Sequence, residues 1–253
     1  MVDARPDTDV LMIASPRRTL RPVLCLRIYF RQRFYLAAKR CFDVAISLLI
    51  ILGLLSWLLP LLALLIKCTS KGPVFFIQKR VGFLGRSFYC LKLRTMLVNA
   101  EAHAQPAAAD DPRITFIGHF LRRSGLDELP QFFNVLCGHM SIIGPRPHMH
   151  ADCAAFGRLL PGYKLRNISK PGITGLAQSR GLRGPIAHHQ QLQQRFYLDA
   201  WYVRNRSFLL DLKILAATAV VITRDITALL QRNSKPANKT SVPDLGFSTP
   251  LSA

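Results

Sequence analysis

The sequence predicts a helix-rich α/β protein that is associated with a membrane. Two observations support this fold class. An uncharged apolar run extends from Val44 to Ile66, and the residues after it alternate between short strand-like pieces and segments with helical periodicity. The chain has 253 residues, which is enough for one sizeable domain with appendages or for two small domains.

The apolar run is long enough to cross a bilayer. At about 1.5 Å per residue, a helix over Val44–Ile66 would span the ~30 Å hydrocarbon core. The run begins too deep in the chain for an ordinary signal peptide and lacks a small-residue cleavage site. A buried core helix is the alternative, and the length of the run disfavours it.

The flanks of the run suggest an unusual topology. Basic residues such as Arg40 and Lys67 lie on both sides, and the positive-inside rule places both ends in the cytoplasm. Pro60 removes a backbone donor, and Ser56 lies one turn earlier, where its hydroxyl can satisfy a freed carbonyl. We therefore expect residues 39–68 to form a re-entrant membrane helix, kinked at Pro60, that enters and leaves by the cytoplasmic face.

The composition of the chain divides the rest of it into a basic N-terminal segment, a main domain and a polar tail. Residues 1–38 form a basic, variable segment, and the stretch LRIYFRQRFYLAAKR (residues 26–40), which begins in this segment, has the pattern of an interfacial amphipathic helix. Residues 69–231 form the main domain. Residues 232–253 are polar and are expected to be disordered.

Within the main domain, three patterns predict local structure. Strand-like pieces around Gly82 and Gly85 predict a β-hairpin. From Arg113 the periodicity predicts a helix that stops at Gly138. Residues 208–230 predict an amphipathic helix that lies on the membrane or covers the core.

The net charge of +20 indicates an anionic partner. Nucleic acid, an anionic membrane surface and phosphorylated substrates are the candidate classes. The chain has no basic stripe interleaved with exposed aromatics and no nucleic-acid-binding motif, so we expect no nucleic acid partner. The six cysteines are scattered without metal-ligand spacing and indicate separate thiols in a reducing compartment.

Basic residues occur singly beside glycines, prolines and turns. This spacing suits the bidentate binding of discrete phosphates, whereas for any one residue alone a solvated surface charge is the simpler interpretation. The candidates are Lys79, Arg80, Lys92, Arg94, Arg113, Arg122, Arg123, Arg146, Arg166 and Lys170.

The stretch SGLDELPQ places two acids, Asp127 and Glu128, side by side in this basic chain. They could start a helix, bind a metal or take part in catalysis. Ser124 and Asp127 have the spacing of a capping box, which would place Ser124 at a helix start. Neighbours on a helix point about 100° apart, so a shared proton is not implied. One carboxylate could attack phosphorus while the other holds Mg²⁺ or orients groups.

A series of motifs occurs in a fixed order along the chain: KRCFD, GPVFFIQKRVG, LKLRTM, DPRIT, LRRSGLDELPQFFNVLCGHMSIIGPRP, KPGITGLAQ and DLKIL. Together they resemble the bacterial sugar transferases, that is, the monotopic polyprenyl-phosphate phosphoglycosyl transferases. The resemblance runs from about Lys39 to Leu230 and covers most of the chain.

The resemblance implies an enzyme of the bacterial inner membrane whose catalytic domain faces the cytoplasm. It would transfer a sugar 1-phosphate from a UDP-sugar, with UDP-glucose or another UDP-hexose as the best candidate, to undecaprenyl phosphate. A covalent aspartyl-phosphosugar intermediate, UMP release and a Mg²⁺ cofactor are further implications. The product would be the first intermediate of an exopolysaccharide, capsule or O-antigen repeat unit. Downstream glycosyltransferases that extend it are further expected partners.

The resemblance also suggests roles for individual residues. By position, Asp127 would be the nucleophile and Glu128 its neighbour in metal or proton handling, and both are the expected Mg²⁺ ligands. Residues that match family positions or motifs associated with substrate phosphates are Arg122, Arg146, Lys92 and Arg94.

Three positions depart from the family pattern. His139 stands where an acid is usual, which could alter the activity or its pH range. Leu59 precedes Pro60 where serine is common, which changes the chemistry of the kink, and Pro185 replaces another expected acid, which weakens the sugar assignment. A catalytically weak homologue that acts as a membrane-bound partner in a polysaccharide assembly complex is therefore an alternative. A basic peripheral protein that binds anionic lipid or nucleic acid without chemistry is another.

Overall fold

The computed structural model describes residues 22–98, 111–184, 186 and 188–231. By its internal contacts the chain divides into two compact units, residues 1–37 and 38–253. The predicted tail 232–253, Pro185 and most of the predicted N-terminal segment lie outside the described residues.

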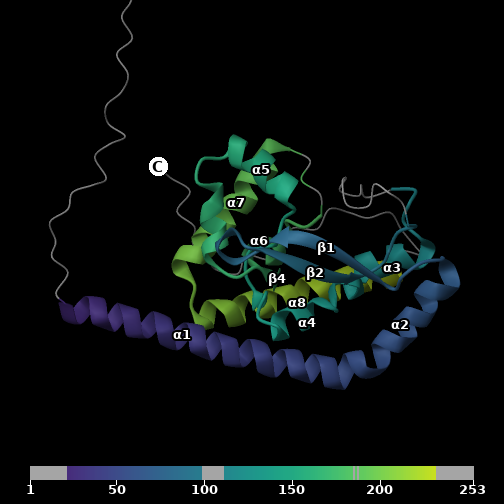
Figure 1. The fold of residues 1–253 in the computed structure, drawn as a ribbon, viewed down its shortest axis with the longest axis horizontal. Helices are drawn as coiled ribbons and strands as arrows, with labels where there is room; N and C mark the ends of the chain where they lie inside the picture. The colour runs from purple at the N-terminus through teal and green to yellow at the C-terminus, as the bar shows by residue number, and fades with distance from the viewer. Residues whose placement is uncertain (1–21, 99–110, 185, 187, 232–253) are drawn as a thin grey trace, which may run out of the picture. The chain divides into compact units, whose positions relative to one another are not determined.

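The apolar run forms the end of one helix and the whole of the next. Helix α1 (Pro22–Leu49) continues into a π-helical segment (Ile50–Leu55) and then into α2 (Ser56–Thr69), and the chain changes direction between α1 and α2 (Figure 1). Residues Gln32–Thr69 are long and apolar enough to cross a membrane, and only 17% of their most apolar window is buried within the protein. The helix is consistent with membrane association, and the re-entrant hairpin stays a prediction.

The π-helical segment lies before the proline. The hydroxyl of Ser56 donates to the carbonyl of Leu52 at 2.7 Å, and the indole of Trp57 donates to the carbonyl of Gly53 at 3.0 Å. Such donors satisfy carbonyls that a π-turn leaves misaligned. Helix α2 continues through Pro60 without interruption. The irregular backbone therefore lies one turn or more upstream of the predicted kink residue.

The predicted hairpin is confirmed. Strand β1 (Phe75–Val81) pairs antiparallel with β2 (Ser87–Leu93), and the turn contains a short 3₁₀ helix, Phe83–Gly85. Side chains alternate between exposed and partly buried along β1. Because Phe76 pairs with Lys92 and Arg80 with Phe88, these side chains share the inner face of the hairpin.

The predicted helix between Arg113 and Gly138 is wrong as a single element. The chain forms α3 (Phe116–Ser124), a 3₁₀ helix (Leu126–Glu128) and α4 (Gln131–Leu136). Gly125, with φ of 72°, ends α3, because this left-handed conformation cannot continue a helix. The predicted stop is confirmed, since Gly138 follows α4 with φ of 83°.

The predicted capping box is also wrong. Ser124 lies at the end of α3, where its hydroxyl donates to the carbonyl of Phe120 at 2.8 Å. The residue that caps α3 is Thr115, whose hydroxyl accepts from the amide of Gly118 at 3.0 Å. Asp127 therefore does not close a helix N-terminus with Ser124.

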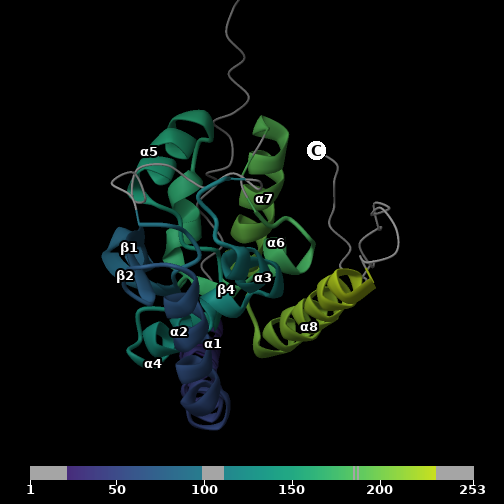
Figure 2. The ribbon, with the colours of Figure 1, turned by 90° about the vertical axis from the view of Figure 1, so that its right-hand side faces the viewer.

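The remaining elements surround a parallel strand pair. Strand β3 (Ser141–Ile143) lies beside β4 (Gly172–Thr174), and Figure 2 shows α6 between α7 and α8. The main core consists of Phe88, Cys90, Val135, Met140, Ile142, Ile143, Leu176, Tyr202, Leu210 and Ile214. The other helices are α5 (His150–Leu159), a 3₁₀ helix (Tyr163–Ile168), α6 (Leu176–Ser179), α7 (His189–Asn205) and α8 (Phe208–Gln231). Helix α8 covers the core with one face, which was one of its two predicted placements.

Buried polar contacts fasten the second part of α1 to the core. Lys39 Nζ lies 2.8 Å from Asp211 Oδ2 on α8, and the hydroxyl of Tyr202 donates to Asp211 Oδ1 at 2.7 Å. Asp43 Oδ1 accepts from the amide of Ile142 at 3.0 Å. Leaving any of these charges unpaired would cost several kcal/mol by general estimates, so the start of the apolar run has a defined position on the domain.

Candidate active site

The two acids lie in the 3₁₀ helix Leu126–Glu128, directly after the left-handed Gly125. Successive residues of a 3₁₀ helix point about 120° apart, so Asp127 and Glu128 face different surroundings. The side chain of Glu128 is 18% exposed, and Asp127 as a residue is 9% exposed. Two neighbouring carboxylates are thus both largely withdrawn from water.

Glu128 is paired with two cations. Its Oε1 lies 2.6 Å from Lys92 Nζ and 2.6 Å from Arg146 Nη2, and Oε2 accepts from Arg146 Nη1 at 3.2 Å. Lys92 comes from β2, and Arg146 from the GPRP loop after β3. Three predicted site residues from separate parts of the sequence therefore meet in one group.

Asp127 differs from its neighbour. Among the residues that the structure describes, none donates a hydrogen bond to its carboxylate. Burial raises the pKa of Asp127 to about 6, and the charge of Glu128 adds to this effect against the opposing charges of Lys92, Arg146 and Arg122. The carboxylate is desolvated and surrounded by cations, yet no hydrogen bond from a described residue holds it.

The pKa of Glu128 moves in the opposite direction. Burial alone would raise it, but the charges and hydrogen bonds of Arg146 and Lys92 outweigh burial and hold the pKa well below its usual range. The charge of Glu128 in turn raises the pKa of Arg146. Glu128 therefore stays ionised and acts as the anchor of this cationic group.

The other two predicted phosphate ligands are placed differently. Arg122 Nε donates to the hydroxyl of Thr95 at 2.8 Å. Burial lowers the pKa of Arg122, and the charge of Asp127 acts in the opposite direction. Arg94 instead donates to the carbonyls of Lys71 at 2.7 Å and Ser70 at 2.9 Å. Arg122 therefore belongs to the surroundings of Asp127, whereas Arg94 binds the backbone directly after α2.

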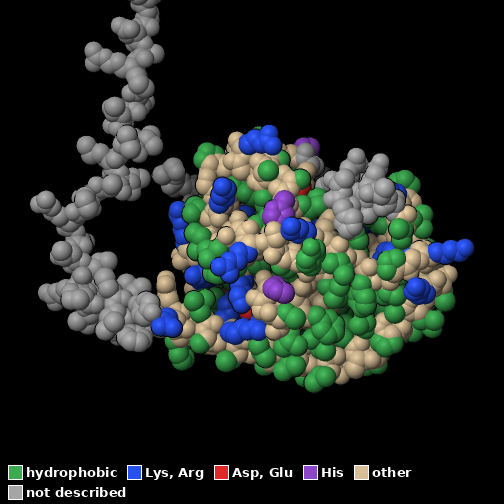
Figure 3. Space-filling view, viewed as in Figure 1, with side chains coloured by type: hydrophobic (Ala, Val, Ile, Leu, Met, Phe, Trp, Pro, Cys, Tyr) green, Lys and Arg blue, Asp and Glu red, His purple; other side chains and the backbone are tan. Residues whose placement is uncertain are grey.

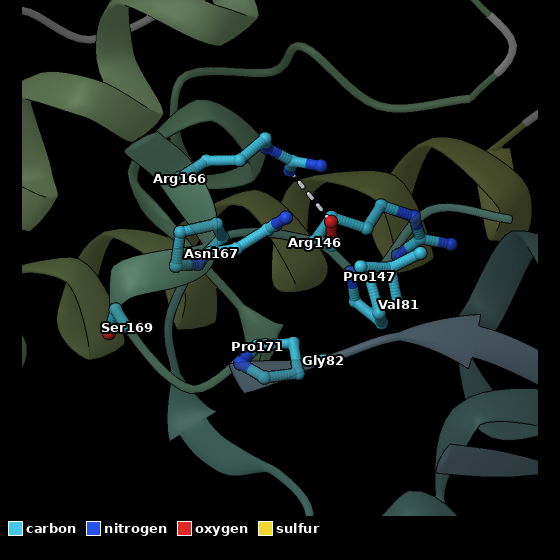
Figure 4. A pocket seen from close by; sticks show the side chains of 9 residues that line it. Val81, Gly82, Arg146, Pro147, Arg166, Asn167, Ser169 and Pro171 are labelled. Carbon is cyan, nitrogen blue, oxygen red and sulfur yellow. Dashed lines mark hydrogen bonds between the residues drawn. The ribbon is translucent and has the colours of Figure 1, made fainter. Parts of the chain in front are cut away.

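The loop that carries Arg146 is held from its other side. Arg166 Nη2 donates to the carbonyl of Arg146 at 2.7 Å and to Asp199 Oδ2 at 2.6 Å, and Figure 4 shows Arg166 above Arg146 in a small cavity. Arg80 Nη1 donates to the carbonyl of Pro147 at 2.6 Å. These two arginines act on the backbone of the loop, so they position Arg146 and its neighbours.

Sequence reasoning missed one member of the group. Burial lowers the pKa of Arg183, and Asp225, Arg146 and Glu128 act on it as neighbouring charges. Its Nε donates to the carbonyl of Gln178 at 3.3 Å. The signal available was the glycine-flanked basic stretch SRGLRG, which has the same turn-associated pattern as the predicted phosphate ligands.

His139 lies away from the acids. Its side chain is exposed and stacks on the ring of Phe88, with the centroids 6.2 Å apart. Phe88 lies four residues before Lys92 on β2, a separation of about 13 Å along a strand. The ring contact of His139 is thus with the start of β2, whereas Glu128 pairs with Lys92 near its end.

The donor set limits how a metal could bind. The described residues contain no group of three or more His, Cys, Asp or Glu side chains that could hold one. Mg²⁺ typically binds one or two carboxylates together with substrate phosphates and water. A carboxylate offers about four acceptor sites, and Glu128 uses three of them. Asp127 and Glu128 therefore fit Mg²⁺ provided that a phosphorylated substrate supplies further oxygens.

Within the described parts of the chain, the site thus combines several cations with one carboxylate that accepts no hydrogen bond. Such an arrangement can bind a diphosphate and can attack phosphorus with a carboxylate oxygen.

Comparisons with known proteins point to one family. A family model described as bacterial sugar transferase matches residues 34–225. The UDP-glucose:undecaprenyl-phosphate glucose-1-phosphate transferase of Xanthomonas campestris pv. campestris is 43% identical over 201 residues, which cover 78% of this chain and 41% of that protein.

Two further relatives differ in length and in the sugar that they are named for. The exopolysaccharide production protein PSS of Rhizobium leguminosarum bv. phaseoli is 44% identical over 73% of this chain and 94% of its own length. The UDP-N-acetylgalactosamine-undecaprenyl-phosphate N-acetylgalactosaminephosphotransferase of Aeromonas hydrophila is 41% identical over 73% of this chain and 43% of its own. The chain thus spans about two fifths of the length of some relatives and nearly all of another.

Proposed function

Because the chain belongs to the bacterial sugar transferase family, we propose that it transfers a sugar 1-phosphate from a UDP-sugar to undecaprenyl phosphate. The names of its relatives support this reaction, and UDP-glucose is the sugar donor that several of them share. The observation that carries the proposal is the contrast between Asp127, which accepts no hydrogen bond from a described residue, and Glu128, which accepts three.

The reaction that we propose proceeds in two steps. A carboxylate oxygen of Asp127 attacks the sugar-side phosphorus of the UDP-sugar, forming a P–O bond while the bond to the bridging oxygen breaks and UMP leaves. A phosphate oxygen of undecaprenyl phosphate then attacks the same phosphorus, and the bond to Asp127 breaks. The products are a polyprenyl-diphospho-sugar and the regenerated carboxylate.

The surrounding residues lower the barrier through electrostatics. Arg146, Lys92 and Arg122 offset the negative charge of the diphosphate, so that an anionic nucleophile can approach it. Glu128 holds Arg146 and Lys92 in place. Asp127 and Glu128 are the residues that would hold Mg²⁺ with the diphosphate, and the metal would further neutralise charge at the phosphates.

The experiment uses purified full-length protein with undecaprenyl phosphate, Mg²⁺ and UDP-glucose labelled in the glucose. We expect lipid-linked label and equimolar UMP, and, when the acceptor is left out, label bound covalently to the protein. Asp127→Asn should lose both labels, whereas Lys164→Gln, at an exposed lysine of the 3₁₀ helix Tyr163–Ile168, should keep them. Label retained on Asp127→Asn would disprove the nucleophile. No lipid product with any UDP-sugar would favour a membrane-bound partner protein instead.

We further propose that the apolar helix is re-entrant and that the catalytic domain faces the cytoplasm of a bacterial inner membrane. On this arrangement, exposed amphipathic surfaces would contact membrane lipids, and the product would pass to downstream glycosyltransferases of exopolysaccharide synthesis. Cys41 and Cys68 flank the apolar run and are exposed, so they report on its two ends.

In a variant that keeps only these two cysteines, a membrane-impermeant thiol reagent should label neither in intact cells and both in inverted membrane vesicles. Labelling of one cysteine from each side would show a spanning helix and contradict the hairpin.

A further inference from the structure

A second group of basic side chains lies where α1 meets the parallel strands. The first residues of β3 and β4 pair with each other, so His139 and Lys170, two positions earlier, come to the same edge of the pair. Arg40 approaches from α1. Arg40 Nη2 and Lys170 Nζ each lie 3.7 Å from the point that a Cβ on Gly138 would occupy. We call Arg40, His139 and Lys170 the Gly138 basic cluster.

Donors in this cluster are available. Within the part of the chain that the structure describes, the half-buried ammonium of Lys170 has no hydrogen-bond or ion-pair partner. Arg40 donates from Nη1 to the carbonyl of Val135 at 2.7 Å and from Nη2 to that of Leu136 at 2.8 Å. A guanidinium has five N–H donors, which leaves three. Burial and the charge of Arg40 lower the pKa of Lys170.

Asp43 is the acid among the described residues whose charge acts on Lys170, and it does not neutralise the cluster. Asp43 is buried, and its Oδ1 already accepts from the hydroxyl of Ser141 at 3.1 Å and the amide of Ile142 at 3.0 Å. Its charge favours the ammonium form of Lys170. Arg40 and Lys170 thus lie together, and Asp43, whose charge acts on Lys170, also interacts with the charge of Lys39. The surplus positive charge attracts an anion.

The position of the cluster indicates which anion. Arg40 lies four residues before Val44, where the apolar run begins, and Leu48 and Leu49 on the same helix are exposed. Basic side chains at the start of a membrane segment lie at the level of lipid headgroups. Figure 3 shows basic side chains gathered on one part of this face, next to an extensive hydrophobic area.

From this placement we propose that the Gly138 basic cluster binds the phosphate group of an anionic glycerophospholipid. Its residues differ from those around the acids, because Arg40 binds the carbonyls of Val135 and Leu136, whereas Lys92 and Arg146 pair with Glu128. The inference does not rest on the proposed transfer reaction. Its consequence is a lipid contact that orients the domain at the point where the apolar helix enters the membrane.

The test measures binding of dioctanoyl phosphatidylglycerol to the purified full chain in neutral detergent by isothermal titration calorimetry. A basic residue near a membrane surface contributes about fivefold in affinity, so Lys170→Gln should weaken binding by about that factor. His139→Asp should weaken it at least as much, since it supplies an internal carboxylate to the cations. Lys164→Gln, at an exposed lysine of the 3₁₀ helix Tyr163–Ile168, is the matched control and should bind as the wild type does.

Two further arms identify the source of the phosphate. Dioctanoylglycerol, which lacks phosphate, should not bind at this site, and inorganic phosphate should bind more weakly than the lipid. Equal binding of inorganic phosphate would overturn the lipid assignment. Unchanged lipid affinity in both Lys170→Gln and His139→Asp, with thermal unfolding like that of the wild type, would overturn the site. The site would also be overturned if Lys170→Gln changed only the KM for undecaprenyl phosphate and left the affinity for the lipid unchanged.

Discussion

Glu128 and Arg146 form a two-bond ion pair, with 2.6 Å between Oε1 and Nη2 and 3.2 Å between Oε2 and Nη1. Lys92 adds a third bond to Oε1 at 2.6 Å. The adjacent Asp127 accepts no hydrogen bond from a described residue. One carboxylate therefore holds the cations together, and its neighbour lies beside them without a hydrogen bond from a described residue.

Removing the charge of Glu128 should release these cations. Glu128→Gln keeps the size of the side chain but loses the ion pair, and we expect kcat to fall about 10²–10³-fold, as for other losses of preorganised charge. Arg146→Gln should have a similar effect. Because the two residues act through one contact, the double variant should lose far less than the product of the single losses. Steady-state kinetics with UDP-glucose measure this, and multiplicative losses would contradict the coupling.

Activity should depend on the ionisation of Asp127. Its pKa of about 6 means that the carboxylate becomes protonated as the pH falls through this value, and a protonated carboxyl cannot attack phosphorus. We expect kcat/KM to fall about tenfold per pH unit below about 6 and to be level above it. The pH profile is measured after confirming that activity returns on transfer to pH 7. A profile that stays level to pH 5 would contradict this assignment.

The buried charge of Asp127 should also destabilise the fold. A pKa of about 6 in the folded protein against 3.8 in the unfolded chain corresponds to a cost of up to about 3 kcal/mol when the group is ionised. The raised pKa makes this cost appear as the pH rises from about 4 to about 6. Asp127→Asn should therefore melt several degrees above the wild type at pH 7 and close to it at pH 4.

The control for this measurement is Asp225→Asn on α8. Its carboxylate is half exposed and 3.3 Å from Arg183, and a surface pair of this kind contributes little. If Asp127→Asn and Asp225→Asn shift the Tm equally at pH 7, the destabilisation does not come from burial of Asp127.

Gly118 should tolerate no side chain. A Cβ on Gly118 would lie 2.0 Å from the carbonyl oxygen of Thr95, and the hydroxyl of Thr95 also accepts the hydrogen bond from Arg122. Gly118→Ala should lower stability by about 1–3 kcal/mol and reduce kcat/KM by displacing Arg122. Thermal unfolding and kinetics measure the two effects.

Gly157 on α5 is the matched helical control. A Cβ there would meet no atom within 4 Å, so Gly157→Ala should raise stability by up to about 1 kcal/mol. Equal effects of the two alanine substitutions would show that the close approach of Thr95 is not what requires glycine at position 118.

Local patterns in the sequence determined several elements by themselves. Alternating side chains around Gly82 and Gly85 predicted the hairpin, Gly138 predicted a helix end, and the apolar run predicted a helix long enough to cross a membrane. These features depend on residues close together in the chain, so a short window contains their cause. The proximity of two acids within a basic chain likewise marked Asp127 and Glu128 as candidates.

The tertiary structure decided what those residues do. Ser124 has the spacing of a cap, yet the left-handed Gly125 after it makes it the end of α3. Lys92 and Arg94 look alike in one motif, but only Lys92 reaches Glu128. The contrast between the acids depends on Arg146, 18 residues beyond Glu128, and on burial. Charges and desolvation act through space, so only the folded chain gives neighbouring carboxylates different chemistry.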